Sequence, residues 1–203
     1  MILRLLRGHA ARTDLPALLA AVRGDIEEWA AIDDGLVAVQ AAFRETDDGM
    51  EFLLVSSWKT AESVLARGGE VTLPRGRLAA SGLLHHARAQ HYELLLDRTV
   101  AGDRSGMVLR LSSMALTPGL ATGFYERVRR LWEQLVGGAG LEATSVGRRI
   151  GPETEQAVVV TVWDSRAAIE AATSGGFVGG DEMAAYYATE PVIEHFTALD
   201  LDG

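Results

Sequence analysis

The segment VSSWKTAESVL, from Val55 to Leu65, has a close counterpart in VTVWDSRAAIEAA, from Val160 to Ala172. In both segments an apolar run typical of a strand ends on a tryptophan, and an alanine-containing helical pattern follows. The two tryptophans lie 105 residues apart. These segments therefore predict one strand-to-helix junction that occurs twice in the chain.

Two further pairs of segments recur with nearly the same separation. Leu-Arg-Leu is centred on Arg4 and again on Arg110, and a histidine followed by an aromatic residue occurs at His91 and again at His195. Three anchors in the same order at one long period are typical of duplicated domains. We expect domains at 1–98 and 107–203, joined by a linker at 99–106.

Each half shows the same expected order of strand, helix, hairpin, helix and strand. The first helix of each half begins near Thr13 or Asp14 and near Thr117, where N-capping residues precede or accompany a proline. Such a βαββαβ unit forms an antiparallel sheet with both helices on one face. We therefore expect an α+β fold of two ferredoxin-like domains that pack sheet to sheet as an intramolecular pseudo-dimer. The expected strands are 2–10, 36–44, 51–58, 91–96, 107–116, 141–150, 157–163 and a last strand at His195, and the expected short helices are 59–67 and 165–173.

Composition limits the function classes. The 203 residues carry a net charge of −9 without a basic stripe, so we expect no nucleic-acid partner. No apolar stretch is long enough for a membrane helix, and the N-terminal segment has the pattern of a strand rather than of a signal peptide, so we expect a cytoplasmic protein without a membrane partner. The absence of cysteine excludes disulfides, thiolate nucleophiles and cysteine-ligated metals.

The two tryptophan-ending junctions resemble those of the antibiotic biosynthesis monooxygenase-like proteins of the dimeric α/β-barrel superfamily. The resemblance covers nearly the whole chain, once in each half. It implies that the two sheets form an intramolecular dimeric α/β barrel with an apolar pocket between sheet and helices. The superfamily includes cofactor-free monooxygenases of polycyclic phenols, haem-degrading enzymes and members without a known activity.

The chain departs from the active members of that superfamily in two ways. Cofactor-free monooxygenases and haem degraders use an asparagine beside the strand-end tryptophan, and this chain contains no asparagine. Where the haem degraders have a haem-ligating histidine, this chain has Gly68 and Thr173. These differences argue against haem degradation. Cofactor-free oxygenation would need another donor, such as arginine, histidine or tyrosine, in place of the amide.

Trp58 and Trp163 are the first candidate catalytic residues, because an indole N–H at a strand end can donate a hydrogen bond into a pocket. The alternative is that each ring fills the end of its own core. His91 and His195 are candidate general bases near neutral pH, with Tyr92 assisting proton transfer. The alternative for both histidines is a structural role at the start of a strand.

Arg4, Arg44 and Arg149 are candidate substrate-binding residues. Arg4, like its counterpart Arg110, interrupts an apolar strand, and Arg44 and Arg149 lie near strand ends. A guanidinium among apolar residues needs an acceptor, which a ligand carboxylate or phenolate could supply. The alternative is that each arginine faces solvent or pairs with an acidic residue across the sheet.

No cofactor and no metal site are expected. Nucleotide and nucleophile-elbow motifs are absent, and the adjacent His85 and His86 point in different directions, which disfavours a shared metal. The glycine-rich segment GGFVGG at 175–180 is interpreted as a lid or a plain loop.

The sequence predicts a cofactor-independent monooxygenase-like protein that acts on an aromatic or phenolic small molecule. The alternative is a non-catalytic small-ligand-binding or structural protein of the same fold. In either case one half could keep the pocket while the other serves as scaffold, and further oligomerisation stays open.

Overall fold

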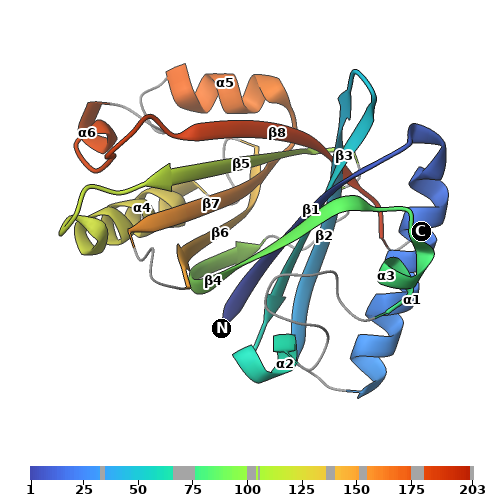
Figure 1. The fold of residues 1–203 in the computed structure, drawn as a ribbon. Helices are drawn as coiled ribbons and strands as arrows, with labels where there is room; N and C mark the ends of the chain where they lie inside the picture. Colours follow the sequence, from blue (N-terminus) through green and yellow to red (C-terminus); the bar gives the residue numbers. More distant parts are fainter. Residues whose placement is uncertain are drawn as a thin grey trace. The chain divides into compact units, whose positions relative to one another are not determined.

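The structure is a computed structural model (Figure 1). It describes residues 1–32, 35–65, 76–99, 104, 106–135, 140–150, 155–174 and 181–201. Gly68, most of the expected linker at 99–106 and the glycine-rich segment at 175–180 lie outside the described residues.

The strands form a closed antiparallel barrel in the order β1-β3-β2-β8-β5-β7-β6-β4. This arrangement confirms the predicted α+β barrel fold. The strands are β1 (Ile2–Ala10), β2 (Leu36–Thr46), β3 (Gly49–Trp58), β4 (His85–Thr99), β5 (Val108–Ala115), β6 (Leu141–Arg149), β7 (Gln156–Trp163) and β8 (Val192–Leu199).

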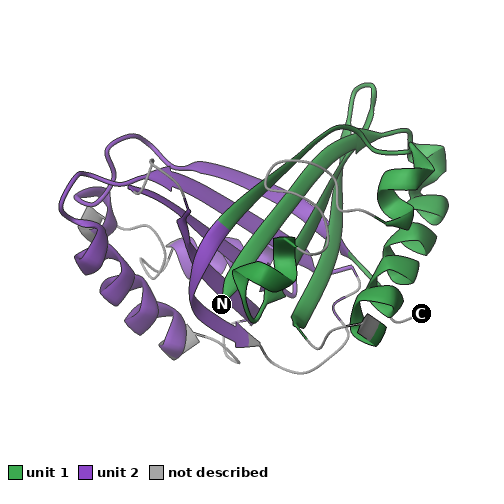
Figure 2. Ribbon diagram, turned by 60° about the horizontal axis from the view of Figure 1, so that its bottom comes forward, with its two compact units in different colours: residues 1–91, 199–203 green, residues 92–198 purple. Residues whose placement is uncertain are grey.

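The chain divides into two compact units (Figure 2). Unit 1 comprises Met1–His91 and Leu199–Gly203, and unit 2 comprises Tyr92–Ala198. Both β4 and β8 contribute residues to each unit, so the compact units do not coincide with the two sequence repeats. The duplication and its domain boundaries stay predictions.

In unit 1 the helix α1 (Leu15–Ile32) covers one face of the sheet β1-β3-β2. Its apolar positions recur at three- and four-residue spacing, and Leu18, Val22 and Trp29 are each at most 3% exposed. Leu18 and Val22 pack with strand residues such as Leu6 and Leu54, which face each other across β1 and β3, and Trp29 packs with Trp58 at the end of β3. The 3-10 turn η1 (Arg12–Asp14) precedes α1, and α2 (Ala61–Leu65) and α3 (Arg77–Ser81) complete the unit.

In unit 2 the helix α4 (Ala121–Leu135) lies along the sheet of β5, β7 and β6 (Figure 1). Phe124, Val128 and Trp132 on α4 pack with Val146 and Val159 of the sheet in one hydrophobic core. The candidate site lies on this side of the sheet, beneath α4. The remaining helices of unit 2 are α5 (Arg166–Ser174) and α6 (Asp181–Ala184).

Some element boundaries differ from those expected. The helix near Thr117 begins only at Ala121, because Gly119 adopts a left-handed φ of 82° that a helix cannot contain. The short helix α3 is not among the helices that the sequence predicts. Its first backbone N–H groups are capped from another element by the buried Asp25, which accepts from Arg77 N at 2.5 Å and from Leu78 N at 3.1 Å.

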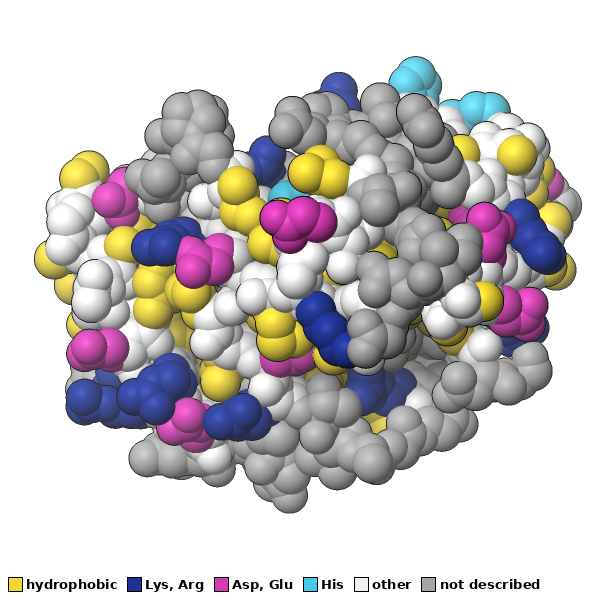
Figure 3. All heavy atoms as spheres, turned by 90° about the horizontal axis from the view of Figure 1, so that it is seen from below, with side chains coloured by type: hydrophobic (Ala, Val, Ile, Leu, Met, Phe, Trp, Pro, Cys, Tyr) yellow, Lys and Arg dark blue, Asp and Glu magenta, His cyan; other side chains and the backbone are white. Residues whose placement is uncertain are grey.

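Charged side chains of both signs lie interspersed on the face that Figure 3 shows. On α4, for example, Arg129 pairs with Glu133 at 3.3 Å. No helix among the described residues has the length and apolar character that crossing a membrane requires.

Gly147 of β6 allows close packing within unit 2. A Cβ at this position would lie 2.7 Å from Tyr92 Cβ and 3.2 Å from Val158 Cγ1. We expect Gly147→Ala to lower the free energy of unfolding by about 1–3 kcal/mol, because the neighbouring strands must shift to admit the methyl group. Urea denaturation measures this, and a change below about 0.5 kcal/mol would mean that the strands accommodate the methyl without strain.

Candidate ligand site in unit 2

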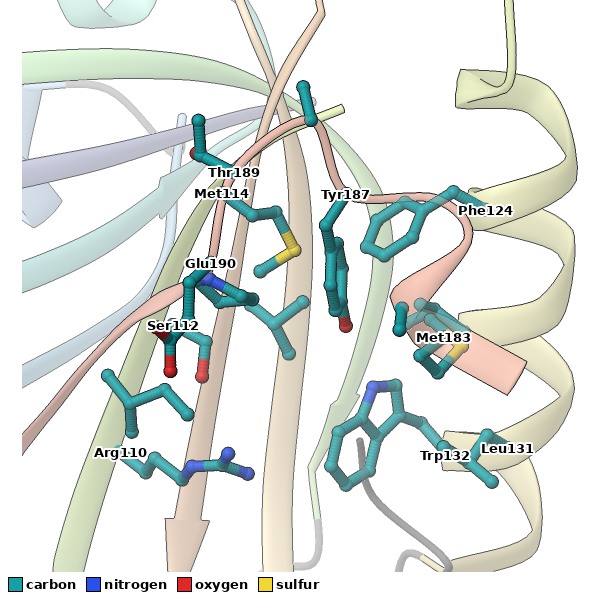
Figure 4. Close-up of a pocket in the computed structure, with 16 residues that line it drawn as sticks. Arg110, Ser112, Met114, Phe124, Leu131, Trp132, Met183, Tyr187, Thr189 and Glu190 are labelled. Carbon is teal, nitrogen blue, oxygen red and sulfur yellow. The ribbon is translucent and has the colours of Figure 1, made fainter. Parts of the chain in front are cut away.

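Unit 2 contains a cavity of about 550 Å³ between α4 and the sheet face that α4 covers (Figure 4). Most of its wall is apolar, which suits a hydrophobic or aromatic ligand. The sheet contributes Arg110, Ser112, Met114, Val159 and Ile193, α4 contributes Phe124, Val128, Leu131 and Trp132, and the segment from Met183 to Pro191 contributes the rest.

Polar groups of three different elements point into the cavity. Figure 4 shows the guanidinium of Arg110, from β5, and the ring of Trp132, from α4, facing each other across one end of the cavity. The ring of Tyr187 extends toward the same end with its hydroxyl leading. A ligand in the cavity would therefore meet hydrogen-bond donors at this end, and Ser112, Thr189 and Glu190 are further polar residues of the lining.

Arg110 is a buried cation. Its side chain comes from the middle of an apolar strand and is only 7% exposed. Burial lowers the pKa of Arg110, which the nearby Tyr187 partly offsets, but the group remains protonated near neutral pH. Within the described part of the chain, no carboxylate pairs with its guanidinium. An anionic ligand would pair with this buried charge and offset the cost of its burial.

The two aromatic groups at this end are also available as donors. Burial raises the pKa of the Tyr187 hydroxyl above its usual value of 10.0, so this group keeps its proton near neutral pH. The Trp132 side chain is 4% exposed, and its indole N–H meets no acceptor among the described residues. An indole N–H can only donate.

His195 of β8 is the cross-strand neighbour of Arg110 in register. Both side chains therefore leave the sheet on the side that α4 covers. Burial first, and then the charges of Arg166 and Arg110, lower the pKa of His195. The imidazole is thus neutral near pH 7 and can accept a proton.

Trp163 stands behind the cavity rather than in its wall. Its indole Nε1 donates to Thr161 Oγ1 at 2.8 Å, and Thr161 Oγ1 donates to the backbone carbonyl of Arg110 at 3.4 Å. Its ring packs edge-on against Trp132, with centroids 6.2 Å apart. Trp163 therefore supports two of the donors that face the cavity.

The corresponding residues of unit 1 are closely packed. Trp58 Nε1 donates to Ser56 Oγ at 2.9 Å, and the ring lies 5.4 Å from that of Trp29. Arg4, which faces Ser56 in register, is 2% exposed, and burial lowers its pKa to about 10. A cavity of about 440 Å³ in unit 1 is formed instead by residues of α1 and β2 with Leu201, and its lining includes neither Arg4 nor Trp58.

The other predicted site residues are not among those that line the unit 2 cavity. Arg44 pairs with Glu51, its neighbour across the sheet, at 2.5 Å, and Arg7 also contacts Glu51 at 3.1 Å. The guanidinium of Arg149 lies 5.4 Å from the centre of the Tyr92 ring, which is within the range of a cation–π interaction. His91, half-buried, directly precedes Tyr92 in β4. The proposed roles of these residues stay predictions.

Sequence reasoning identified only part of this constellation. It singled out Arg110 as a cation in an apolar strand, and it named His195 and Trp163. It missed Trp132 and Tyr187 as cavity residues. The helical spacing of Trp132 after Phe124 and Val128 was the available signal, whereas nothing in the sequence near Tyr187 indicates that its ring turns toward β5. No group of three or more potential metal ligands occurs among the described residues.

Comparison with solved structures finds the same fold in monooxygenase-like proteins. A candidate monooxygenase of Lactobacillus acidophilus NCFM has a TM-score of 0.76 at 11% identity, over 97% of this chain and 93% of that one. An anthrone oxidase-like protein has a TM-score of 0.59 at 19% identity, over 98% and 92%. A ferredoxin-fold protein of Listeria monocytogenes 4b F2365, related to antibiotic biosynthesis monooxygenases, has a TM-score of 0.57 at 11% identity, over 98% and 95%.

The chain matches no protein-family model and no curated protein. At these low identities the structural likeness establishes the fold alone. The chain therefore has the ferredoxin-like barrel fold of the antibiotic biosynthesis monooxygenase-like proteins, as the sequence resemblance predicted, and its activity has to be argued from the cavity.

The unpaired charge of Arg110 should cost the unliganded protein stability. We expect Arg110→Met, which keeps an unbranched apolar stem without the charge, to raise the free energy of unfolding by about 1 kcal/mol or more. The matched control Arg129→Met, on the exposed face of α4, should change it by less than about 0.5 kcal/mol. Chemical denaturation measures both variants. A clear loss of stability in Arg110→Met would show that the cation is stabilised by the protein itself.

The lowered pKa of His195 predicts a pH dependence of stability. Between the folded-state pKa and the unfolded value of 6.5, the unfolded chain binds more protons than the folded one, so this histidine makes stability rise with pH through that window. His195→Gln should remove this part of the pH dependence. Denaturation curves of the two proteins from about pH 5 to 8 test it. Parallel curves would mean that the pKa is not lowered by folding.

Proposed function

We propose that the protein is a cofactor-independent monooxygenase-like enzyme that oxidises an aromatic, phenolic small molecule in the unit 2 cavity. The observation that carries this proposal is the buried cation at Arg110, which faces a largely apolar cavity of about 550 Å³ and pairs with no carboxylate of the described residues. Such a site is built to hold an aromatic ring whose oxygen substituent carries or develops negative charge.

Three features of the site support proton removal from such a substrate. His195 is neutral near pH 7 because its pKa is lowered, so it can act as the base. Arg110 is in register beside it and can stabilise the anion that forms. The Tyr187 hydroxyl and the Trp132 indole can donate hydrogen bonds to the same anion, and they replace the amide that the chain does not have.

The chemistry then needs only substrate and molecular oxygen. Loss of a proton from an acidic ring carbon to His195 gives a carbanion delocalised onto the phenolate oxygen. Electrons pass from the carbanion to oxygen, a carbon–oxygen bond forms, and protonation gives a hydroperoxide. Loss of water from the hydroperoxide leaves a quinone, so that one oxygen atom enters the product and the other leaves as water. The anthrone oxidase-like protein with this fold makes an anthrone a suitable test substrate.

A non-catalytic ligand-binding role is the second candidate. The missing asparagine favours it, as does the position of His195, which lies beside Arg110 but not among the residues that line the cavity. In this case the cavity would hold the same class of ligand without oxidising it.

Oxygen uptake with anthrone distinguishes the two roles. We expect wild-type protein to accelerate uptake, and His195→Gln to reduce kcat at least about tenfold, as removal of a general base does. Trp163→Phe should also lower turnover, because it removes the hydrogen bond from the indole to Thr161, which in turn bonds the backbone carbonyl of Arg110. Trp58→Phe, the matched change in unit 1, should leave turnover unchanged if the activity resides in unit 2.

Oxygen uptake that is no faster with the protein than in buffer alone would contradict the enzymatic role and leave ligand binding as the function. Equal losses in Trp58→Phe and Trp163→Phe, with both variants folded by circular dichroism, would instead assign the activity to both units.

A further inference from the structure

The unit 2 cavity brings three donor side chains together at one end, and the carboxylate of Glu190 and the hydroxyl of Ser112 are the acceptors that also line it. The guanidinium of Arg110 and the indole of Trp132 carry N–H donors and contain no acceptor atom. Tyr187 keeps its proton and can donate as well. A neutral phenol at this end would bring a donor of its own to a place that already has donors, whereas an ionised carboxylate accepts through two oxygens.

The charges around the cavity favour a single negative charge on the ligand. Arg110 supplies one positive charge, and no carboxylate pairs with it within the part of the chain that the structure describes. Glu190 also lines the cavity, and the chain as a whole carries a net charge of −9. A dianion such as a phosphate ester would meet repulsion that a monoanion largely avoids.

We propose that the ligand of the unit 2 cavity is an aromatic carboxylate, held by its carboxylate on Arg110 with Tyr187 and Trp132 as further donors. This inference rests on the proposed ligand site and adds the chemical class of the group that anchors the substrate. A planar carboxylate matches the fork of a guanidinium, and the pair is strongest where water is excluded. The ring then lies against Phe124 and Val128.

The acid–base properties of the ligand reinforce this choice. Near pH 7 a carboxylic acid is fully ionised, whereas an ordinary phenol, with a pKa near 10, is neutral. The buried cation therefore binds a carboxylate without first removing a proton.

Calorimetric titration with 2-naphthoate and 2-naphthol at pH 7 tests the inference, since the two probes share a ring system and differ in the anchoring group. We expect wild-type protein to bind 2-naphthoate at least about tenfold more tightly than 2-naphthol, the effect of one charge-assisted hydrogen bond or more. Arg110→Met should abolish this preference by weakening the binding of 2-naphthoate more than that of 2-naphthol. The control Arg129→Met, with the same loss of charge on the outer face of α4, should keep the preference.

Equal affinities of wild-type protein for both probes, or the same preference in Arg110→Met, would overturn the inference, as would the absence of binding of either probe. The titration does not depend on turnover. If anthrone is oxidised but 2-naphthoate shows no preference, the anchoring group is wrong and the proposed enzyme stands. If the preference is found without oxygen uptake, the carboxylate site stands and the enzymatic role falls.

Discussion

The tryptophan at the end of a central strand, covered by a second tryptophan from the first long helix, is the contact on which each unit depends. Trp58 meets Trp29 in unit 1, and Trp163 meets Trp132 in unit 2. Each strand tryptophan donates its N–H to a hydroxyl two residues earlier in its own strand, Ser56 or Thr161. The contact therefore fixes both the position of the helix over the sheet and the end of the strand beneath it.

The same contact leads to different results in the two units. In unit 1, Arg4 and its surroundings are packed beneath α1. In unit 2, the edge-on approach of Trp132 and the hydrogen-bond chain from Trp163 through Thr161 hold Arg110 at a cavity with apolar walls. A charge that is expensive to bury is kept there, and no carboxylate of the described residues pairs with it. This pattern is typical of a binding site, where stability is given up for a ligand that completes the pair.

The architecture was predictable because its signals are local and occur twice: apolar alternation, strand-ending tryptophans and helical stripes. The short helix α3 was not, because its capping carboxylate, Asp25, comes from a helix 52 residues away in the sequence. The site was predictable only in part for the same reason. An arginine in an apolar strand is visible in the sequence, but whether it meets Glu51, as Arg44 does, or an open cavity, as Arg110 does, depends on which side chains the fold brings opposite it.

The central claim is that ligand binds beneath α4 in unit 2, with its anion on Arg110. A crystal structure of the protein grown with 2-naphthoate tests this most directly, because it separates Arg110 from the other arginines that the sequence suggested. We expect the ring between Phe124 and Val159 and the carboxylate within hydrogen-bond distance of the Arg110 guanidinium. Ligand bound instead at Arg44 or Arg149, with the unit 2 cavity free of it, would contradict the account.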